Sequence, residues 1–69
     1  MIKLGKYRHF KGKEYEVIAV AKHTEDLKDY VVYRALYGDY GLWVRPLEMF
    51  CEEVEVNGKK LNRFEYIGD

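Results

Sequence analysis

One set of residues in this 69-residue chain combines aromatic rings with cations and is therefore suited to binding chemistry. Its members are Tyr7, Arg8, His9, His23, Tyr37, Asp39, Tyr40, Trp43 and Arg45. Aromatic rings on the loops and strand edges of a small domain form shallow grooves that pack against proline-rich peptides or stack on bases. An arginine adds a charged, bidentate contact and a cation–π interaction. We therefore predict a ligand-binding face made of Trp43, Arg45, Tyr37, Tyr7 and His9.

Each of these five residues has an expected role and a structural alternative. Trp43 and the tyrosines would stack on the ligand, Arg45 would make the charged contact, and His9 would be a pH-sensitive polar donor. In the alternative, Trp43 and Tyr7 fill the core and the arginines pair with surface acids. Replacing a buried Trp43 with alanine would cost roughly 3–5 kcal/mol of stability. Replacing an exposed one would abolish binding and leave the fold intact.

Metal binding and covalent catalysis find weaker support in the sequence. His9, His23 and Cys51 lack the paired, closely spaced ligands of structural zinc sites. Cys51 is the only cysteine, and its expected position opposite Phe64 makes it a small buried hydrophobe with an inert thiol. The chain contains no serine and no glycine-rich phosphate loop. We therefore predict no catalytic residue, no metal, no cofactor and no enzymatic activity.

The balance of basic and acidic residues narrows the classes of partner that this chain could bind. Lys+Arg and Asp+Glu both number 12, and this neutral total argues against the broad basic surface that duplex DNA requires. The first thirteen residues nevertheless carry five basic side chains and no acid, namely Lys3, Lys6, Arg8, Lys11 and Lys13. The acidic residues between 48 and 55 are typical of a solvated hairpin face, and two of them have expected basic partners across the hairpin. A local basic patch is thus compatible with the neutral total.

The single cysteine also bears on where the protein works. One thiol cannot form an intrachain disulfide, and it suits a reducing compartment, so we expect a cytoplasmic protein. The first residues hold no apolar run of signal-peptide length. No window approaches the ~20 apolar residues of a membrane helix, so we expect no membrane association.

About five short strands are expected to position the binding face. Residues 6–10 form the first, 14–23 the clearest, and 30–37 a third that is rich in β-branched and aromatic residues. In residues 14–23 strict alternation would place Tyr15, Val17, Ala19 and Ala21 on one face. Residues 38–41 form a hairpin loop, 42–45 return as a strand, and Pro46 ends that strand.

The last element is a predicted hairpin around Asn57-Gly58, which favours a two-residue type I′ turn. The resulting register pairs opposite charges and apolar residues: Glu55 with Lys60, Val54 with Leu61, Glu52 with Arg63 and Cys51 with Phe64. The apolar residues of this register fall on opposite faces. We therefore expect a bulge or a strong twist near Glu52-Glu53.

Two short segments predict single helical or 3₁₀ turns. In residues 24–29, Thr24 followed by acidic residues has the features of a capped first helical turn. In residues 46–50, Pro46 stands at a position where a helix tolerates proline well.

These elements predict an all-β domain that spans residues 1–69. A chain of this length buries only ~60% of its unfolded surface, and a single sheet would leave an apolar face in water. Curling the sheet into a barrel buries that face and removes the open edges. We therefore predict a small five-stranded SH3-like barrel. The alternative is an open antiparallel sheet that buries its face by dimerising.

Several runs of residues carry a family resemblance. They are Gly5-x-Tyr7-Arg8-His9-Phe10-Lys11-Gly12 with Tyr15 and Val17, then Ala21-x-His23, Val31-Val32-Tyr33, Leu36-Tyr37-Gly38-Asp39, Trp43-Val44-Arg45-Pro46, Met49-Phe50, Val54-x-x-x-Gly58 and Arg63-Phe64. On these residues the chain resembles the bacterial domain-of-unknown-function family 1653 from Gly5 to about Ile67. Leu27 departs from the resemblance, because an acidic or polar residue is expected there. The resemblance implies a small stand-alone domain and no particular activity.

The function that these observations favour is a non-catalytic binding module for a protein, peptide or small-molecule ligand. The first alternative is binding of single-stranded nucleic acid or a nucleotide through the same face, which would depend strongly on salt. The second alternative is a small hydrolase or metal enzyme. We expect a monomer or a homodimer.

Overall fold

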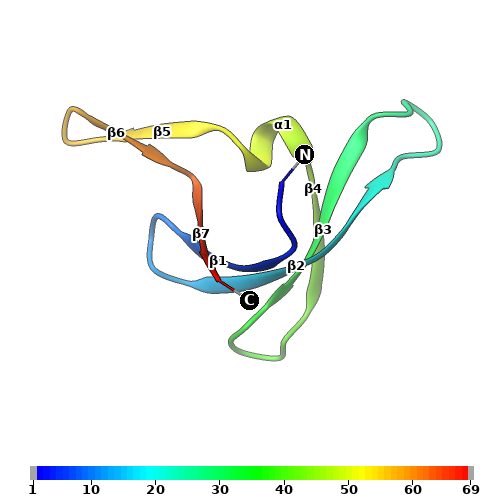
Figure 1. Cartoon of the computed structure of the whole chain (residues 1–69), viewed down its shortest axis with the longest axis horizontal. Helices are drawn as coiled ribbons and strands as arrows, with labels where there is room; N and C mark the ends of the chain where they lie inside the picture. The colour runs from blue at the N-terminus through cyan, green and yellow to red at the C-terminus, as the bar shows by residue number, and fades with distance from the viewer. Residues whose placement is uncertain (1, 69) are drawn as a thin grey trace.

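Strands dominate the computed structural model, which describes residues 2–68 (Figure 1). Five strands form one antiparallel sheet in the order β4-β3-β2-β1-β7. Their bounds are Gly5–His9 for β1, Glu14–Lys22 for β2, Asp29–Ala35 for β3, Leu42–Pro46 for β4 and Phe64–Gly68 for β7. A separate hairpin pairs Glu53–Val56 (β5) with Lys59–Asn62 (β6), and Leu47–Phe50 forms α1. The expected all-β class and five-stranded sheet are confirmed.

The sheet curves beneath α1, but over residues 2–68 its two edges are not joined (Figure 1). β4 pairs with β3, and β7 pairs with β1. Among residues 2–68, no ladder connects β4 to β7 and so closes a barrel. We call the side on which α1 packs the inner face of the sheet.

Two stacked phenylalanines form the centre of the core on this inner face. The rings of Phe50, from α1, and Phe64, from β7, lie 4.0 Å apart and within 3° of parallel. Tyr7 and Tyr33 pack edge-on against Phe50, with ring centroids at 5.3 Å and 5.6 Å. The other buried members of the core are Val17 and Val31. The four-residue helix α1 is thus held on the sheet by the buried Phe50 ring and by the partly buried Leu47, which packs against the same core.

A β-bulge in β2 reverses the expected alternation of its side chains beyond Val17. Val17 pairs with Tyr33, but Ala19 pairs with the next residue along, Val32, so Ile18 is an extra residue in the ladder. Beyond the bulge it is Val20, opposite the fully buried Val31, that faces inward. The prediction that Ala19 and Ala21 continue the face of Val17 is wrong, because one inserted residue reverses every later side chain.

The two predicted helical turns have different outcomes. Residues 47–50 form α1, directly after Pro46, as expected. Near residues 24–29 there is only a hydrogen-bonded turn, in which the Leu27 N–H donates to the His23 carbonyl at 2.9 Å. The Thr24 hydroxyl donates to the neighbouring Glu25 carboxylate and so does not cap a helix. The chain reverses immediately into β3, which leaves no room for a second turn.

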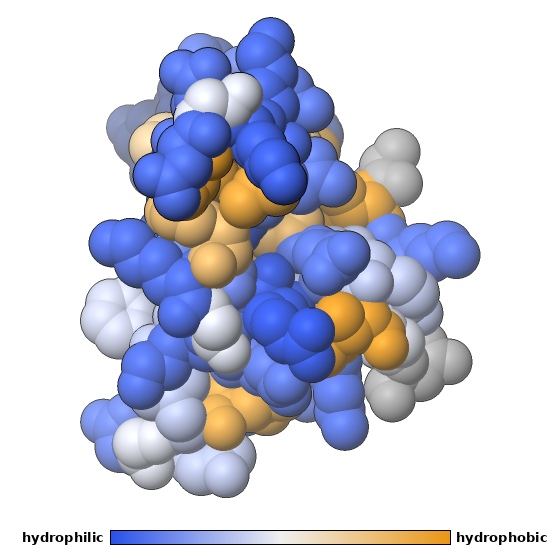
Figure 2. Space-filling model, turned by 90° about the vertical axis from the view of Figure 1, so that its left-hand side faces the viewer, coloured by the Kyte–Doolittle hydropathy of each residue, from blue (hydrophilic) through white to orange (hydrophobic). Residues whose placement is uncertain are grey.

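The β5–β6 hairpin confirms the predicted register. Asn57 and Gly58 both have positive φ, at 52° and 80°, as a type I′ turn requires. Glu55 pairs with Lys60 and Val54 with Leu61. Figure 2, which looks at the side of the molecule from which this hairpin projects, shows a mainly hydrophilic surface with small, separate hydrophobic spots.

The chain bends at Arg63 and leaves this hairpin. Glu52 still lies opposite Arg63, whose N–H donates to the Glu52 carbonyl at 2.9 Å and whose guanidinium reaches the Glu52 carboxylate at 3.3 Å. Phe64 then pairs with His9 in β1 instead of with Cys51. The expectation of a buried Cys51 is therefore wrong, and its thiol is exposed. This bend resolves the conflict between the two apolar faces.

Replacing Phe50 tests whether the stacked pair holds the fold together. We expect Phe50→Ala to lower the free energy of unfolding by about 3–5 kcal/mol, the usual cost of deleting a buried phenylalanine. A domain of this size rarely has more stability than that, so the variant should be largely unfolded in urea titrations followed by circular dichroism. Met49→Ala is the control, because Met49 is 42% exposed on the same short helix. An unchanged midpoint for Phe50→Ala would contradict the assignment.

Leu27 offers a stabilising substitution. It adopts a φ of 59°, which is left-handed, and its side chain is 68% exposed. An L-residue with a Cβ pays roughly 1–2 kcal/mol there, whereas asparagine enters this region readily. We expect Leu27→Asn to raise the free energy of unfolding by about 1 kcal/mol, which differential scanning calorimetry would detect as a higher Tm. Leu27→Ala keeps the strain and should leave Tm nearly unchanged, so equal gains from both variants would refute the explanation.

Candidate functional site

The inner face carries a cluster of rings centred on Tyr15. The Tyr15 ring packs edge-to-face against Tyr33 at 5.4 Å, Tyr37 at 5.5 Å and Phe64 at 5.6 Å. The His9 ring follows at 6.5 Å. The hydroxyl oxygens of Tyr15 and Tyr37 share a hydrogen bond of 2.8 Å. β1, β2, β3 and β7 therefore all contribute to one aromatic surface.

Three of the five predicted site residues meet on this cluster. Arg45 lies with its guanidinium carbon 5.6 Å from the Phe64 ring centroid, and its Nε donates to the Tyr33 hydroxyl at 3.3 Å. His9 packs against the same Phe64 ring at 4.9 Å. Tyr37 contacts the cluster through the Tyr15 ring. We call His9, Tyr15, Tyr37, Trp43 and Arg45, with Lys11 and Lys13 at its margin, the aromatic–cation face.

Tyr7 does not belong to this face. Its side chain is 6% exposed, its ring packs on Phe50, and its hydroxyl donates to the Lys3 carbonyl at 2.7 Å. Burial raises the pKa of Tyr7. The structural alternative therefore holds for this residue, because a buried ring has no face to offer a ligand.

Trp43 lies at the surface. It is 58% exposed, on the edge strand β4, and it pairs with Tyr33, so its side chain projects on the inner side of the sheet. A Cβ added to Gly41 would lie 3.8 Å from the Trp43 Nε1, so the indole leans toward the β3–β4 loop. The core interpretation of Trp43 is therefore wrong, because an edge strand has a neighbour on only one side.

His9 is held as a neutral hydrogen-bond donor. Burial lowers its pKa, and the positive charges of Arg45, Arg63 and Lys11 lower it further. The His9 Nδ1 accepts the Lys11 N–H at 3.2 Å, so the ring proton lies on Nε2. At neutral pH this histidine therefore presents an N–H without a charge.

Several cations on the aromatic–cation face have no carboxylate partner. Within residues 2–68 the ion pairs join Arg8 to Glu14, Lys22 to Asp29 and Arg63 to Glu52. Arg45, Lys11 and Lys13 take part in none of them. Lys13 instead lies over the Tyr37 ring, with its Nζ 4.5 Å from the centroid. The face therefore carries positive charge that acids in the described chain do not neutralise.

Comparison with known proteins places the chain in a family. The model described as "Protein of unknown function (DUF1653)" matches residues 5–66. The chain belongs to the DUF1653 family. A crystal structure of a DUF1653 protein from Bordetella bronchiseptica is similar, with 33% sequence identity and a TM-score of 0.90 over 97% of this chain and 88% of that one. Among curated proteins none matches in sequence. The family resemblance is thus confirmed, and the chemistry of this DUF1653 domain has to be argued from its own residues.

Sequence reasoning missed Tyr15 and Phe64 as organisers of the site. Both were assigned only to strands, although each lies close to a turn and can therefore reach the margin of a sheet. The available signal was the alternation that places Tyr15 and Val17 on one face near the start of β2. No local signal reports that Phe64 pairs with His9, because 55 residues separate them.

The described chain shows neither a cluster of metal ligands nor a membrane-spanning helix. Among residues 2–68, no three histidine, cysteine, aspartate or glutamate side chains are placed to hold a metal ion. No helix in that range has the length and apolar character needed to cross a membrane.

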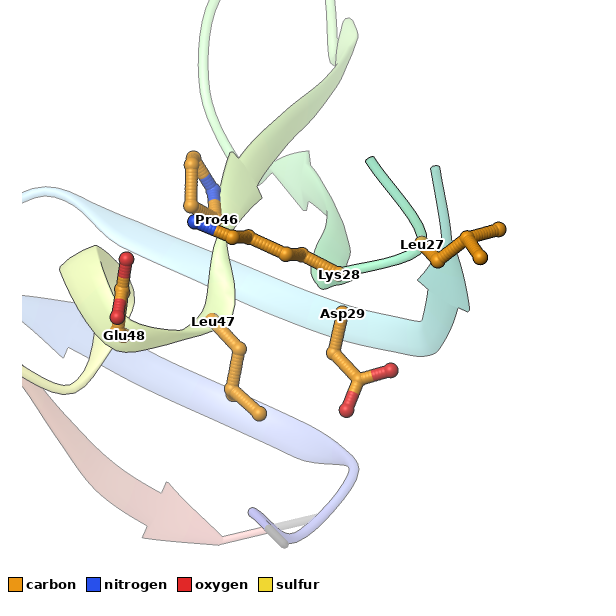
Figure 3. A pocket seen from close by; sticks show the side chains of 6 residues that line it. All are labelled: Leu27, Lys28, Asp29, Pro46, Leu47 and Glu48. Atoms are coloured by element: carbon orange, nitrogen blue, oxygen red, sulfur yellow. The ribbon is translucent and has the colours of Figure 1, made fainter. Parts of the chain in front are cut away.

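A groove of about 340 Å³ lies between the β2–β3 turn and α1 (Figure 3). Lys28 reaches across toward Pro46, whereas Leu27 points away from the helix. The remaining lining residues are Asp29, Leu47 and Glu48. None of the five predicted site residues lines this groove.

The tyrosine pair gives the aromatic–cation face a pH signature. Burial, then the Tyr37 hydroxyl, raises the pKa of Tyr15 from 10.0 to about 12. Because this pKa is higher in the folded protein, the neutral Tyr15 stabilises the fold below the unfolded pKa, and that contribution is lost as pH rises toward 12. We expect Tyr37→Phe to lower the pKa of Tyr15 in a titration followed by tyrosinate absorbance. Tyr40→Phe should not move it, and an unshifted Tyr15 in Tyr37→Phe would contradict the coupling.

Proposed function

We propose that this DUF1653 domain is a non-catalytic binding module that recognises an anionic group attached to a flat or apolar body. The ligand would lie on the aromatic–cation face. The observation that carries the proposal is Arg45, a guanidinium held in an aromatic setting without a carboxylate partner among residues 2–68.

Arg45 is prepared for an anion in two ways. The Arg45 Nε donates a hydrogen bond to the Tyr33 hydroxyl, and the guanidinium carbon lies 5.6 Å from the Phe64 ring centroid, so the side chain loses little further freedom on binding. Its two terminal nitrogens make no hydrogen bond to the described chain. A guanidinium with both terminal nitrogens available matches the two oxygens of a carboxylate or a phosphate.

The surrounding residues would complete recognition. His9 would donate its Nε2–H, and Lys11 and Lys13 would attract the charge at longer range. The exposed rings of Tyr37 and Trp43 would contact the body of the ligand. A protein segment, a peptide or a small molecule can supply this combination. The exposed Cys51 thiol suits a reducing environment, and we place the function in the cytoplasm.

A second candidate is single-stranded nucleic acid or a nucleotide, and two observations favour it. Trp43 exposes a large ring suited to base stacking. The first thirteen residues are basic and free of acids. Lys13, however, already covers one face of Tyr37, which leaves fewer rings open for successive bases.

Amide NMR titration with small probes tests the proposal. Phenyl phosphate and benzoate each join an anion to a ring, and benzylamine is the cationic control. We expect both anions to shift the amides of His9, Tyr15, Tyr37 and Arg45 and to raise the pKa of His9, because a negative charge offsets its cationic neighbours. Benzylamine should leave these signals in place.

Two variants locate the binding. Arg45→Gln should weaken phenyl phosphate at least about tenfold, since a hydrogen bond to a charged group is worth ~1.5–3 kcal/mol. Arg8→Gln is the matched control, because Arg8 is paired with Glu14 on the opposite face of β1. Equal losses in both variants, or shifts scattered over the surface, would refute the site. A mixed-sequence single-stranded oligonucleotide that binds far more tightly than phenyl phosphate and is released by salt would favour the second candidate.

A further inference from the structure

The outer edge of β4 is open and apolar. Leu42, Trp43 and Val44 are consecutive, and they are 57%, 58% and 65% exposed. β4 is the last strand of the sheet and, among residues 2–68, pairs only with β3. A strand edge of this kind is a template for pairing with another strand.

The register shows which backbone groups point outward. The Ala35 N–H donates to the Gly41 carbonyl, and the ladder continues with Tyr33 opposite Trp43. Residues of an antiparallel pair alternate between bonding to the neighbour and facing away from it. Trp43 therefore bonds to β3, and the N–H and C=O of Leu42 and Val44 face outward.

The other edge strand, β7, is interrupted within its length, whereas on β4 the charged Arg45 and Pro46 lie at the end of the strand. β7 contains a register shift at Ile67 and carries the charged Glu65. Bulges and charges are the usual devices that keep an edge strand from pairing. The β3–β4 ladder runs from Tyr30 opposite Pro46 to Arg34 opposite Leu42 without a shift. The stretch from Leu42 to Val44 contains no charge.

We propose that β4 is a dimer interface, on which a second copy of this chain pairs its own β4 antiparallel about a two-fold axis at Val44. Val44 and the partner's Val44 would exchange both hydrogen bonds. The Leu42 N–H would donate to the carbonyl of the partner's Pro46. Pro46 has no N–H to offer, so pairing along the edge ends there.

The side chains favour this register. Centring on Val44 places Trp43 directly opposite the partner's Arg45 on the inner side of the sheet. Arg45 has no acidic partner among residues 2–68, and a guanidinium beside an indole is the most favourable cation–π pair. On the outer side, Leu42 and Val44 would cover the partner's Val44. Moving the axis to Trp43 would instead place the two indoles opposite each other and leave both guanidinium groups without an aromatic partner across the interface.

The dimer extends the aromatic–cation face, because the partner's Trp43 would lie beside Arg45 and line the same surface. The pairing itself does not rest on the proposed ligand. It can therefore be tested on the free protein, and failure of ligand binding would leave it standing.

Sedimentation and hydrogen exchange on the wild-type chain give the direct test. We expect a species of twice the 8.3 kDa protomer mass. The amides of Leu42 and Val44 should be protected from exchange in a concentration-dependent way, since in a single protomer they face solvent. A monomer at all concentrations would overturn the proposal. A dimer in which these two amides exchange freely would overturn it as well.

Substitutions then test the surface and the register. Val44→Lys should give a folded monomer, because two lysines would meet at the axis. Leu61→Lys, at an exposed position on β6, should remain dimeric. In a Cys51→Ser background, Val44→Cys should form an intermolecular disulfide, because paired residues lie ~5.5 Å apart, within the range of a disulfide. Leu42→Cys should not, because its counterpart lies about 13 Å away along the strands. Cross-linking through Trp43→Cys instead of Val44→Cys would overturn the register.

Discussion

The stack of Phe50 on Phe64 is the contact on which the rest of the structure depends. The two rings lie 4.0 Å apart, and they join a four-residue helix to the strand that pairs with β1. A helix so short has almost no stability of its own. The segment between Phe50 and Phe64 contains the β5–β6 hairpin, and the stacked rings hold the two ends of this segment together. Because no disulfide is available, aromatic packing supplies the stability that cross-links supply in many other small domains.

The same ring links the core to the candidate site. Phe64 has one face on Phe50, while Arg45 and His9 lie against other parts of it. A cation placed on a buried aromatic surface is poorly hydrated and interacts strongly with an incoming anion. The lowered pKa of His9 has the same origin, in burial and in the surrounding positive charge. Rigidity and ligand chemistry therefore come from one cluster.

The open edge of the sheet at β4 accounts for the proposed dimer interface. A closed barrel would use both edges, but in the described residues 2–68 β4 and β7 end the sheet and no ladder joins them. The β7 edge is interrupted by a bulge, whereas β4 remains regular, uncharged from Leu42 to Val44, and apolar. A second chain on that edge would cover part of the apolar surface that β4 exposes. The dimer and the ligand face would then share Arg45 and Trp43.

The sequence by itself determined the features that depend on near neighbours. Asn57-Gly58 specified its turn and register, Pro46 marked the start of α1, and the β-branched and aromatic runs marked the strands. Residue type also marked Trp43 and Arg45 as candidates for a binding face, but only the structure decided that Trp43 lies at the surface, where it is 58% exposed on the edge strand β4. Tertiary structure alone decided that Tyr7 is buried, that Cys51 is exposed and that Ile18 is a bulge. These outcomes depend on which distant strand lies alongside, and the pairing of His9 with Phe64 has no local signature because the energy that selects it comes from burying rings contributed by the whole chain.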